Sequence, residues 1–277
     1  MATFVIARLT IREAQRRRLL WVALFMGIAF LLVFGIAFHF IRLDIERFPT
    51  EDDQLQFVSV LLLTAGLYAV NLLVNVVAVL ISVTTLSGEV ESHTIDAIVT
   101  KPIPRWQVVL GKWLGFAGLV LGYLAFLVSG LMLIVYLRSG FYMENIARGV
   151  ALMALAALLV LTVSIAGGTR LSTIANGVLT FMLFGLAFMG GLVEQVGALI
   201  RNPAAVNVGI VSSLIMPADS LWKKAVAYFQ PNGTNNPFEL GPFAAITEPS
   251  GLMVVYAVLY LVVLLAFALW SFSRRDL

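Results

Sequence analysis

The stretch SGEVESHTIDAIVTKPIPR, residues 87–105, separates two long apolar runs and predicts how the rest of the chain is arranged. Ser87 is a common helix cap, and Glu89 and Glu91 would follow it in the first turn, where the helix dipole favours acidic side chains. A helix cannot continue through Pro102 and the second proline that follows it. We therefore expect a short helix that begins at Ser87, lies on the cytoplasmic side of a membrane, and transmits movement to or from a soluble partner.

This expected helix has two different faces. The mostly apolar face carries Val90, Thr94, Ala97 and Ile98. The polar face carries Glu89, His93 and Asp96. An element of this kind can place both faces in a groove of another protein.

The composition of the chain is that of an integral membrane protein. Hydrophobic residues make up 61% of the chain and charged residues 12%, with a mean hydropathy of +0.98. A soluble domain has about 25% charged residues. The basic residues lie beside apolar runs, as membrane topology requires, so the net charge of +3 does not indicate a nucleic acid partner. Without cysteine the chain has no disulfide and no thiolate site.

Six charge-free runs are long enough for transmembrane helices, which need about 20 apolar residues. They are residues 19–41, 55–86, 113–137, 149–169, 171–193 and 251–272. The second run exceeds one crossing, so its helix is tilted or projects past the membrane. Arg170 alone separates the fourth and fifth runs, which predicts antiparallel neighbours. We expect residues 1–277 to form a single all-α transmembrane domain.

Two segments outside these runs are also expected to be helical. Residues 1–18 are basic but have no clean apolar stripe, so they form either an interfacial helix or a basic flank of the first span. Residues 204–229 contain an apolar part and an amphipathic part, interrupted by Pro217. A seventh span there would move Arg274 and its basic neighbour to the outer face. We therefore expect re-entrant or interfacial helices, with both termini in the cytoplasm of a multi-pass cell-membrane protein.

A polar stripe runs along the second span. Its members fall within one narrow helical face and are Thr64, Tyr68, Asn71, Asn75 and Ser82. Polar residues in a membrane need partners, and two interpretations are open. The stripe forms hydrogen bonds between helices, or it lines a subunit interface or a translocation path.

The sequence shows no signature of a catalytic or metal site. His39 and His93 are expected on opposite sides of the membrane and cannot share a metal. A phosphate-binding loop is absent, because Lys112 is followed by Trp113 rather than by Ser or Thr. Glu194 is expected to be a solvated residue at the outer membrane edge. We expect no enzymatic activity and no cofactor bound by this chain.

The loop and its surroundings resemble the permease subunits of type-2 ATP-binding-cassette exporters. In prokaryotic members the loop after the second span reads approximately Glu-x-Glu-x-Gly-Thr-Ile, then five or six residues, then Pro-x-x-Arg and Gly-Lys. The corresponding residues here are Glu89, Glu91, Thr94, Ile95, Pro102, Arg105, Gly111 and Lys112. His93 stands where the family usually has glycine. The layout is also similar, with a basic N-terminal segment, six spans, and an irregular outer segment before the last span.

The resemblance implies a function and a set of partners. Two permease subunits, identical or similar, would form the translocation path and assemble with two separate ATPase subunits, which hold the ATP and Mg²⁺ and drive export. Residues 1–18 would be an elbow helix along the inner membrane face. The coupling helix would contact the ATPase through Glu89, Val90, Glu91, His93, Thr94, Ile95, Asp96, Ile98, Pro102 and Arg105. One alternative is a membrane anchor or signalling subunit for a soluble protein. The other is a secondary transporter, but the expected spans contain no charged residue that could bind a coupling ion.

Overall fold

The computed structural model describes residues 2–16, 18–46, 52–91, 104–143, 145–229 and 247–274, with side chains except at 46, 52–56 and 84–91. Within these ranges the chain forms helices and no strands. They are α1 (Ala2–Arg16), α2 (Arg18–Glu46), α3 (Asp52–Glu91), α5 (Arg105–Ser139), α6 (Ile146–Gly168), α7 (Thr173–Leu199), α8 (Pro203–Ile215), α9 (Ala218–Phe229) and α10 (Gly251–Ser273). The expected all-α class is confirmed.

Six of these helices are long and apolar enough to cross a membrane, namely α2, α3, α5, α6, α7 and α10. This confirms the six predicted spans. At 40 residues, α3 is about 60 Å long, twice the thickness of the hydrocarbon core. The two largest differences from the predicted bounds are at α5, which begins at Arg105 rather than at residue 113, and at α7, which continues past residue 193 to Leu199.

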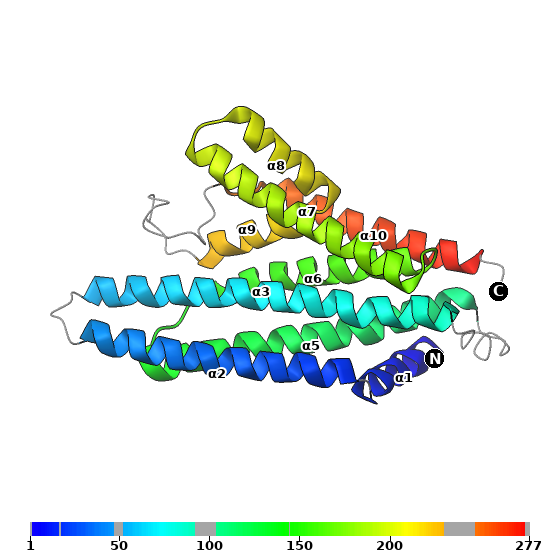
Figure 1. Cartoon of the computed structure of the whole chain (residues 1–277), viewed down its shortest axis with the longest axis horizontal. Helices are drawn as coiled ribbons and strands as arrows, with labels where there is room; N and C mark the ends of the chain where they lie inside the picture. Colours follow the sequence, from blue (N-terminus) through cyan, green and yellow to red (C-terminus); the bar gives the residue numbers. More distant parts are fainter. Residues whose placement is uncertain are drawn as a thin grey trace.

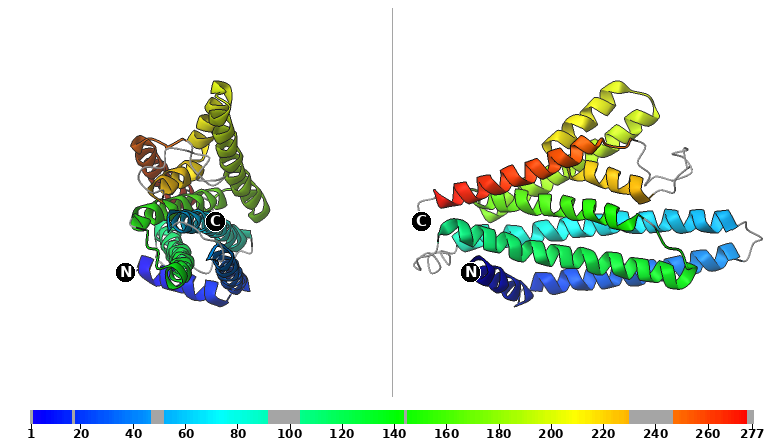
Figure 2. Two further views of the ribbon diagram at one scale, coloured as in Figure 1. Left: turned by 90° about the vertical axis from the view of Figure 1, so that its left-hand side faces the viewer. Right: turned by 180° about the vertical axis from the view of Figure 1, so that it is seen from behind.

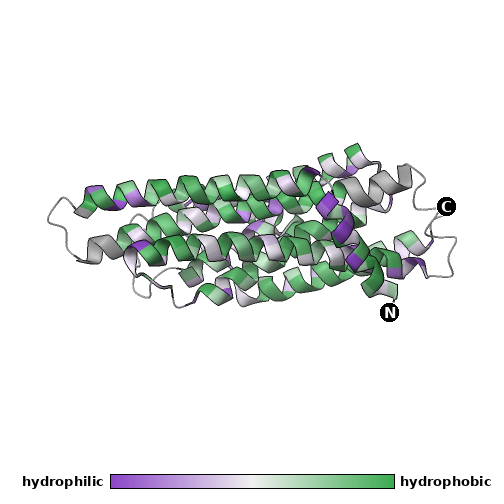
Figure 3. Ribbon diagram, turned by 90° about the horizontal axis from the view of Figure 1, so that it is seen from below, coloured by the Kyte–Doolittle hydropathy of each residue, from purple (hydrophilic) through white to green (hydrophobic). Residues whose placement is uncertain are grey.

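The central helix of the bundle is α6. Two thirds of its most apolar window, 67%, is buried, whereas the share is 11% in α2 and in α10. The helices α2, α3, α5 and α6 run side by side along the molecule, and α7 with α8 projects beyond them (Figures 1 and 2). Hydrophobic residues predominate along most of the length of the helices seen in this view (Figure 3). The start of α1 and the end of α10 lie at the same end of the bundle, as an even number of crossings requires (Figure 1).

The prediction that a new helix begins at Ser87 is wrong. The helix α3 continues without a break from Asp52 to Glu91, so Ser87 lies inside it. A favourable cap residue does not end a helix that is already formed, and one glycine such as Gly88 costs a helix only about 1 kcal/mol relative to alanine. Residues 92–103, which hold the rest of the predicted coupling helix, lie outside the described residues.

The segment before the last span is a bent pair of helices. The helices α8 and α9 meet at an angle of 107° at Met216 and Pro217, so they do not form one straight crossing. One of them, α8, packs along α7, and the other, α9, packs against α6. The turn from α7 to α8 places Arg201 at a φ of 55°, and the side chain of Asn202 then caps α8 by accepting from the N–H of Ala204 at 3.0 Å. The expectation of two helices interrupted at Pro217 agrees with this geometry.

The contact between Gly149 of α6 and Phe229 of α9 can be tested by substitution. A Cβ atom at position 149 would overlap the Phe229 ring, which must move to make room. We expect Gly149→Ala to lower the free energy of unfolding by about 1 kcal/mol, and Phe229→Leu in the same chain to recover part of the loss. Thermal unfolding in detergent measures both.

The matched control is Gly185→Ala, because a Cβ at position 185 meets nothing within 4 Å. This variant reports the gain in helix propensity alone and is expected to be neutral or slightly stabilising. If Gly149→Ala behaves like the control, Gly149 does not limit the approach of α9 to α6.

Candidate functional site

The predicted coupling residues that the structure describes lie where α3 ends and where α5 begins. Glu89, Val90 and Glu91 form the last turn of α3, and Arg105 is the first residue of α5. The remaining residues lie outside the described part of the chain: His93, Thr94, Ile95, Asp96, Ile98 and Pro102. Their contact with an ATPase stays a prediction, but the two helices that flank them are now placed.

The N-terminal segment forms a helix, α1, that packs directly on the start of α5. Two glycines of α5 allow the close approach. A Cβ at Gly111 would lie 2.8 Å from the carbonyl oxygen of Thr3, and a Cβ at Gly115 would lie 2.9 Å from that of Ala7. Thr10 is buried in this contact, with 4% of its surface exposed. The side of α5 that carries Gly111 and Gly115 is therefore covered by α1.

The opposite side of α1 is suited to a membrane surface. It exposes large apolar side chains, with exposed fractions of 79% for Phe4, 58% for Val5 and 56% for Leu9. The arginines Arg8, Arg12 and Arg16 are also exposed. Apolar and basic side chains together on an exposed helix are typical of helices in the interface between lipid and water.

The polar stripe of the second span faces the inside of the bundle. Thr64, Asn75 and Ser82 are buried, and Tyr68 and Asn71 are partly buried. Two of these side chains form hydrogen bonds to backbone carbonyls of their own helix, α3. The Thr64 hydroxyl donates to the Val60 carbonyl at 2.8 Å, and the Asn75 amide donates to the Asn71 carbonyl at 2.7 Å. A role of this stripe in a translocation path or at a subunit interface stays a prediction.

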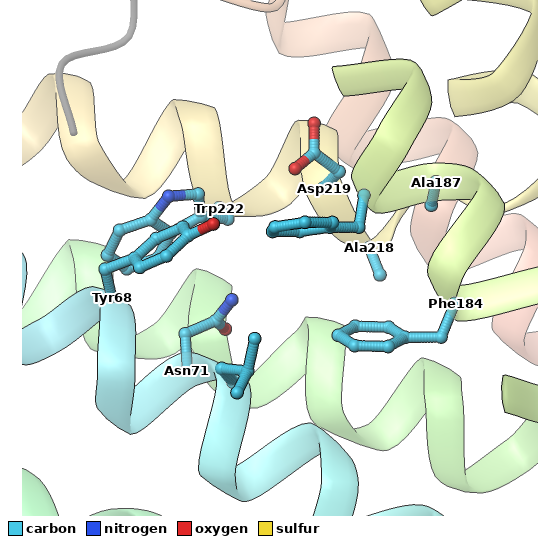
Figure 4. Close-up of a pocket in the computed structure, with 9 residues that line it drawn as sticks. Tyr68, Asn71, Phe184, Ala187, Ala218, Asp219 and Trp222 are labelled. Carbon is cyan, nitrogen blue, oxygen red and sulfur yellow. The ribbon is translucent and has the colours of Figure 1, made fainter. Parts of the chain in front are cut away.

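Two members of the stripe border a small cavity between α3, α7 and α9 (Figure 4). Tyr68 and Asn71 line it from α3, and Asp219 and Trp222 from α9. Its volume is about 20 Å³, enough for about one water molecule. The ring centroids of Tyr68 and Trp222 lie 5.4 Å apart and join α3 to α9. The cavity therefore brings polar groups of α3 and α9 together beside apolar side chains of α7.

A buried cluster of charged residues lies beside this cavity. The ammonium group of Lys223, with 1% of the side chain exposed, lies 2.8 Å from the Glu194 carboxylate and 3.1 Å from the Asp219 carboxylate. The second oxygen of Glu194 accepts a hydrogen bond from Thr247 at 2.8 Å. We call these four residues the outer ion cluster, after the side of the membrane on which the sequence predicts them. It ties α7, α9 and the segment before α10 together.

The outer ion cluster corrects two expectations. Glu194 is not a solvated edge residue, because only 8% of it is exposed and both its oxygens have partners. A candidate span, α7, therefore contains a buried charged residue. The sequence-based argument against a secondary transporter assumed that the spans have none, and that assumption was wrong. In the sequence, the four-residue spacing of Asp219 and Lys223 was the only local signal of a pair. Glu194 has no such signal, because the fold brings it in from another helix.

Glycines make room for the carboxylates of the outer ion cluster. A Cβ at Gly191 would overlap the Asp219 carboxylate, and one at Gly209 would overlap the side chain of Glu194. Within the described residues, no group of three or more His, Asp or Glu side chains is placed to hold a metal ion.

One comparison with known proteins identifies a family. A family model described as an ABC-2 family transporter protein matches residues 4–277. A search of curated proteins finds no match.

Proposed function

The chain belongs to the ABC-2 family of transporters, and from this premise we propose that it is the permease subunit of an ATP-driven exporter. The observation that carries the proposal is the family match over nearly the whole chain, together with six helices long and apolar enough to span a membrane. In this proposal a separate ATPase subunit binds and hydrolyses ATP with Mg²⁺. Two ATPase subunits and a second permease subunit, identical or similar, complete the transporter in the cell membrane.

The arrangement of the helix ends supports a route for coupling. The coupling residues join the end of α3 to the start of α5, so a partner that binds them can move both helices. One of these helices, α3, carries the polar stripe, and the other, α5, carries α1. Movement of the ATPase would therefore reach the inside of the bundle and the membrane surface together, as a rigid-body change between two states.

Co-purification tests the coupling assignment. The chain is expressed with a candidate ATPase that carries a phosphate-binding loop, sought in the adjacent reading frame. The amount of ATPase retained is measured for the double variant Glu89→Lys with Ile98→Asp. We expect at least a tenfold loss, because the double variant alters one acidic and one apolar residue of the predicted ATPase contact. The control is Glu248→Lys, which reverses a charge that is 63% exposed in the segment before α10. If the double variant retains the ATPase and ATP-stimulated transport, the coupling assignment is wrong.

Labelling tests the orientation of the chain. The protein has no cysteine, so single cysteines can be introduced without background. In intact cells, a thiol reagent that does not cross membranes is expected to label Glu248→Cys and to label Asp96→Cys only after permeabilisation. Labelling of Asp96→Cys from outside would place the coupling residues on the wrong side for an ATPase.

A further inference from the structure

The outer ion cluster has more acidic than basic groups. Glu194 and Asp219 each contribute a carboxylate, whereas Lys223 contributes the one ammonium group that pairs with both. The hydroxyl of Thr247 is neutral, so the cluster has a formal charge of −1 when both acids are ionised. A buried charge without a counter-charge has a high free energy, and a buried acid commonly takes up a proton instead.

The two carboxylates of the outer ion cluster are not held equally. The Lys223 ammonium donates a hydrogen bond to Glu194 at 2.8 Å, and the other oxygen of Glu194 accepts from Thr247. The Oδ2 atom of Asp219 lies 3.1 Å from the same ammonium, but it is buried and accepts no well-aligned hydrogen bond from the described residues. Hydrogen bonds to a carboxylate favour its charged form, so Asp219 is the acid that takes up a proton more readily.

The helices around Asp219 bring no second basic group to it. In the described residues, its ion pair is with Lys223 alone. The single charged residue of α7 is Glu194, α8 and α10 have none within their bounds, and the single arginine of α6, Arg148, is exposed. The titratable group that α3 places beside Asp219 is Tyr68. The remaining titratable groups of α9 and α10 have other contacts: Lys224 with Glu248 and Tyr228, and Tyr256 and Tyr260 with backbone carbonyls of α8.

The space beside Asp219 can hold a partner for the protonated acid. The cavity of about 20 Å³ has room for about one water molecule, and Asp219 lines it from α9 while Tyr68 and Asn71 line it from α3 (Figure 4). Gly191 lets the carboxylate lie against α7, but its own N–H belongs to the middle of that helix and is already used. Once protonated, Asp219 becomes a hydrogen-bond donor, and a water in the cavity can accept from it.

The pKa of Asp219 agrees with this geometry. Burial raises the pKa from 3.8 to about 6, the nearby Lys223 opposes the rise, and the Glu194 carboxylate adds to it. Asp219 lies on α9, which is not one of the six spans. The folded chain therefore exchanges this proton at a pH about two units above that of an exposed aspartate.

We propose that the outer ion cluster is a proton-binding site, in which the Asp219 carboxylate takes up one proton and becomes neutral. The proton brings the charge of the cluster to zero and leaves Lys223 to pair with Glu194 alone. It also turns Asp219 from an ionic partner within α9 into a donor toward the cavity that α3 borders. Proton uptake therefore changes how α9 is held between α7 and α3, and it does not depend on the ATP-driven mechanism.

Infrared spectroscopy of the full chain in detergent measures the proton directly, because a protonated carboxyl group has a C=O stretching band that a carboxylate lacks. The natural chain and Asp219→Asn are titrated from about pH 4 to about pH 8. We expect their difference spectrum to contain one carboxyl band, with a midpoint near pH 6. A midpoint near pH 4, as for an exposed aspartate, would overturn the proposal.

Glu194→Gln tests the role of the excess charge. One lysine then balances one acid, so the midpoint of Asp219 is expected to fall by about one pH unit or more. The control Glu248→Gln neutralises an acid that is 63% exposed and pairs with Lys224, and it is expected to leave the midpoint unchanged. A residue that only supports the packing of the cluster would not move the midpoint in this direction.

Two further outcomes would overturn the proposal. The first is an equal midpoint in the natural chain and in Glu194→Gln. The second is a midpoint that moves with sodium concentration at constant ionic strength, which would assign the site to a metal cation. Should Asp219→Asn fail to fold, the midpoints of the natural chain and Glu194→Gln decide, and should Glu194→Gln fail, the difference spectrum of Asp219→Asn decides.

Discussion

Lys223→Met is expected to lower the free energy of unfolding by about 3–5 kcal/mol, which is the usual effect of removing one partner from a buried ion pair. The reason is that the Glu194 and Asp219 carboxylates would stay buried without the ammonium group that lies within 3.1 Å of both. Because the outer ion cluster joins α7 to α9, we also expect the bent pair of α8 and α9 to loosen. Thermal unfolding and hydrogen exchange of α9 measure the two effects.

The adjacent lysine is a matched control. Lys224 also forms an ion pair at 3.0 Å, but its partner Glu248 is 63% exposed. Lys224→Met leaves the exposed Glu248 carboxylate in water and removes one hydrogen bond to the Pro249 carbonyl, so it is expected to cost less stability than Lys223→Met. Equal effects of the two substitutions would show that burial of the outer ion cluster does not govern its contribution.

A triple variant separates unpaired charge from lost packing. Lys223→Met combined with Glu194→Gln and Asp219→Asn removes every charge of the cluster while keeping similar side-chain volumes. A buried neutral amide costs less free energy than a buried unpaired carboxylate, although an amide without a hydrogen-bond partner still has a cost. We therefore expect the triple variant to regain part of the stability that Lys223→Met loses. Failure to regain any would assign the loss to packing or to the hydrogen bond of Thr247.

The parts of the fold that the sequence predicts are those decided by a single stretch of chain. A charge-free run of about 20 residues is long and apolar enough to cross the hydrocarbon core whatever it packs against, which is why the six spans could be predicted directly. Pro217 interrupts a helix in any surroundings, and the bend between α8 and α9 falls beside it. These effects need no knowledge of what else is nearby.

The parts that could not be predicted depend on contacts between distant residues. Glu194 looked like an edge residue because its partner Lys223 lies on a different helix, and only the fold places their charged groups 2.8 Å apart. Ser87 looked like the start of a helix because a cap is judged from a few following residues, whereas α3 had already formed before it. For the glycines of α5, the sequence gives no way to separate those that allow packing, such as Gly115, from those that leave open space, such as Gly118.

Gly115→Leu is expected to detach α1 from α5, with a loss of about 3 kcal/mol, the upper end of the usual range for overpacked interiors. The clash would be with the backbone carbonyl of Ala7 at 2.9 Å as well as with the Thr10 side chain, and no change of rotamer moves a backbone atom. The 15-residue helix α1 has few contacts in the bundle apart from those with α5. If it moves away from Gly115, it therefore loses most of its packing. Spin labels at Arg8→Cys and Leu114→Cys, both exposed positions, measure the separation of the two helices.

The control for this prediction lies one turn further along the same helix. Gly118→Leu adds the same side chain where a Cβ meets nothing within 4 Å, so the label distance is expected to stay unchanged. If Gly115→Leu leaves the distance unchanged as well, the close approach of α1 is not required for its position. If it broadens the distances while the ATPase is still retained, α1 is positioned by α5 and not by the partner. In that case α5 is the helix through which movement of the coupling residues reaches the membrane surface.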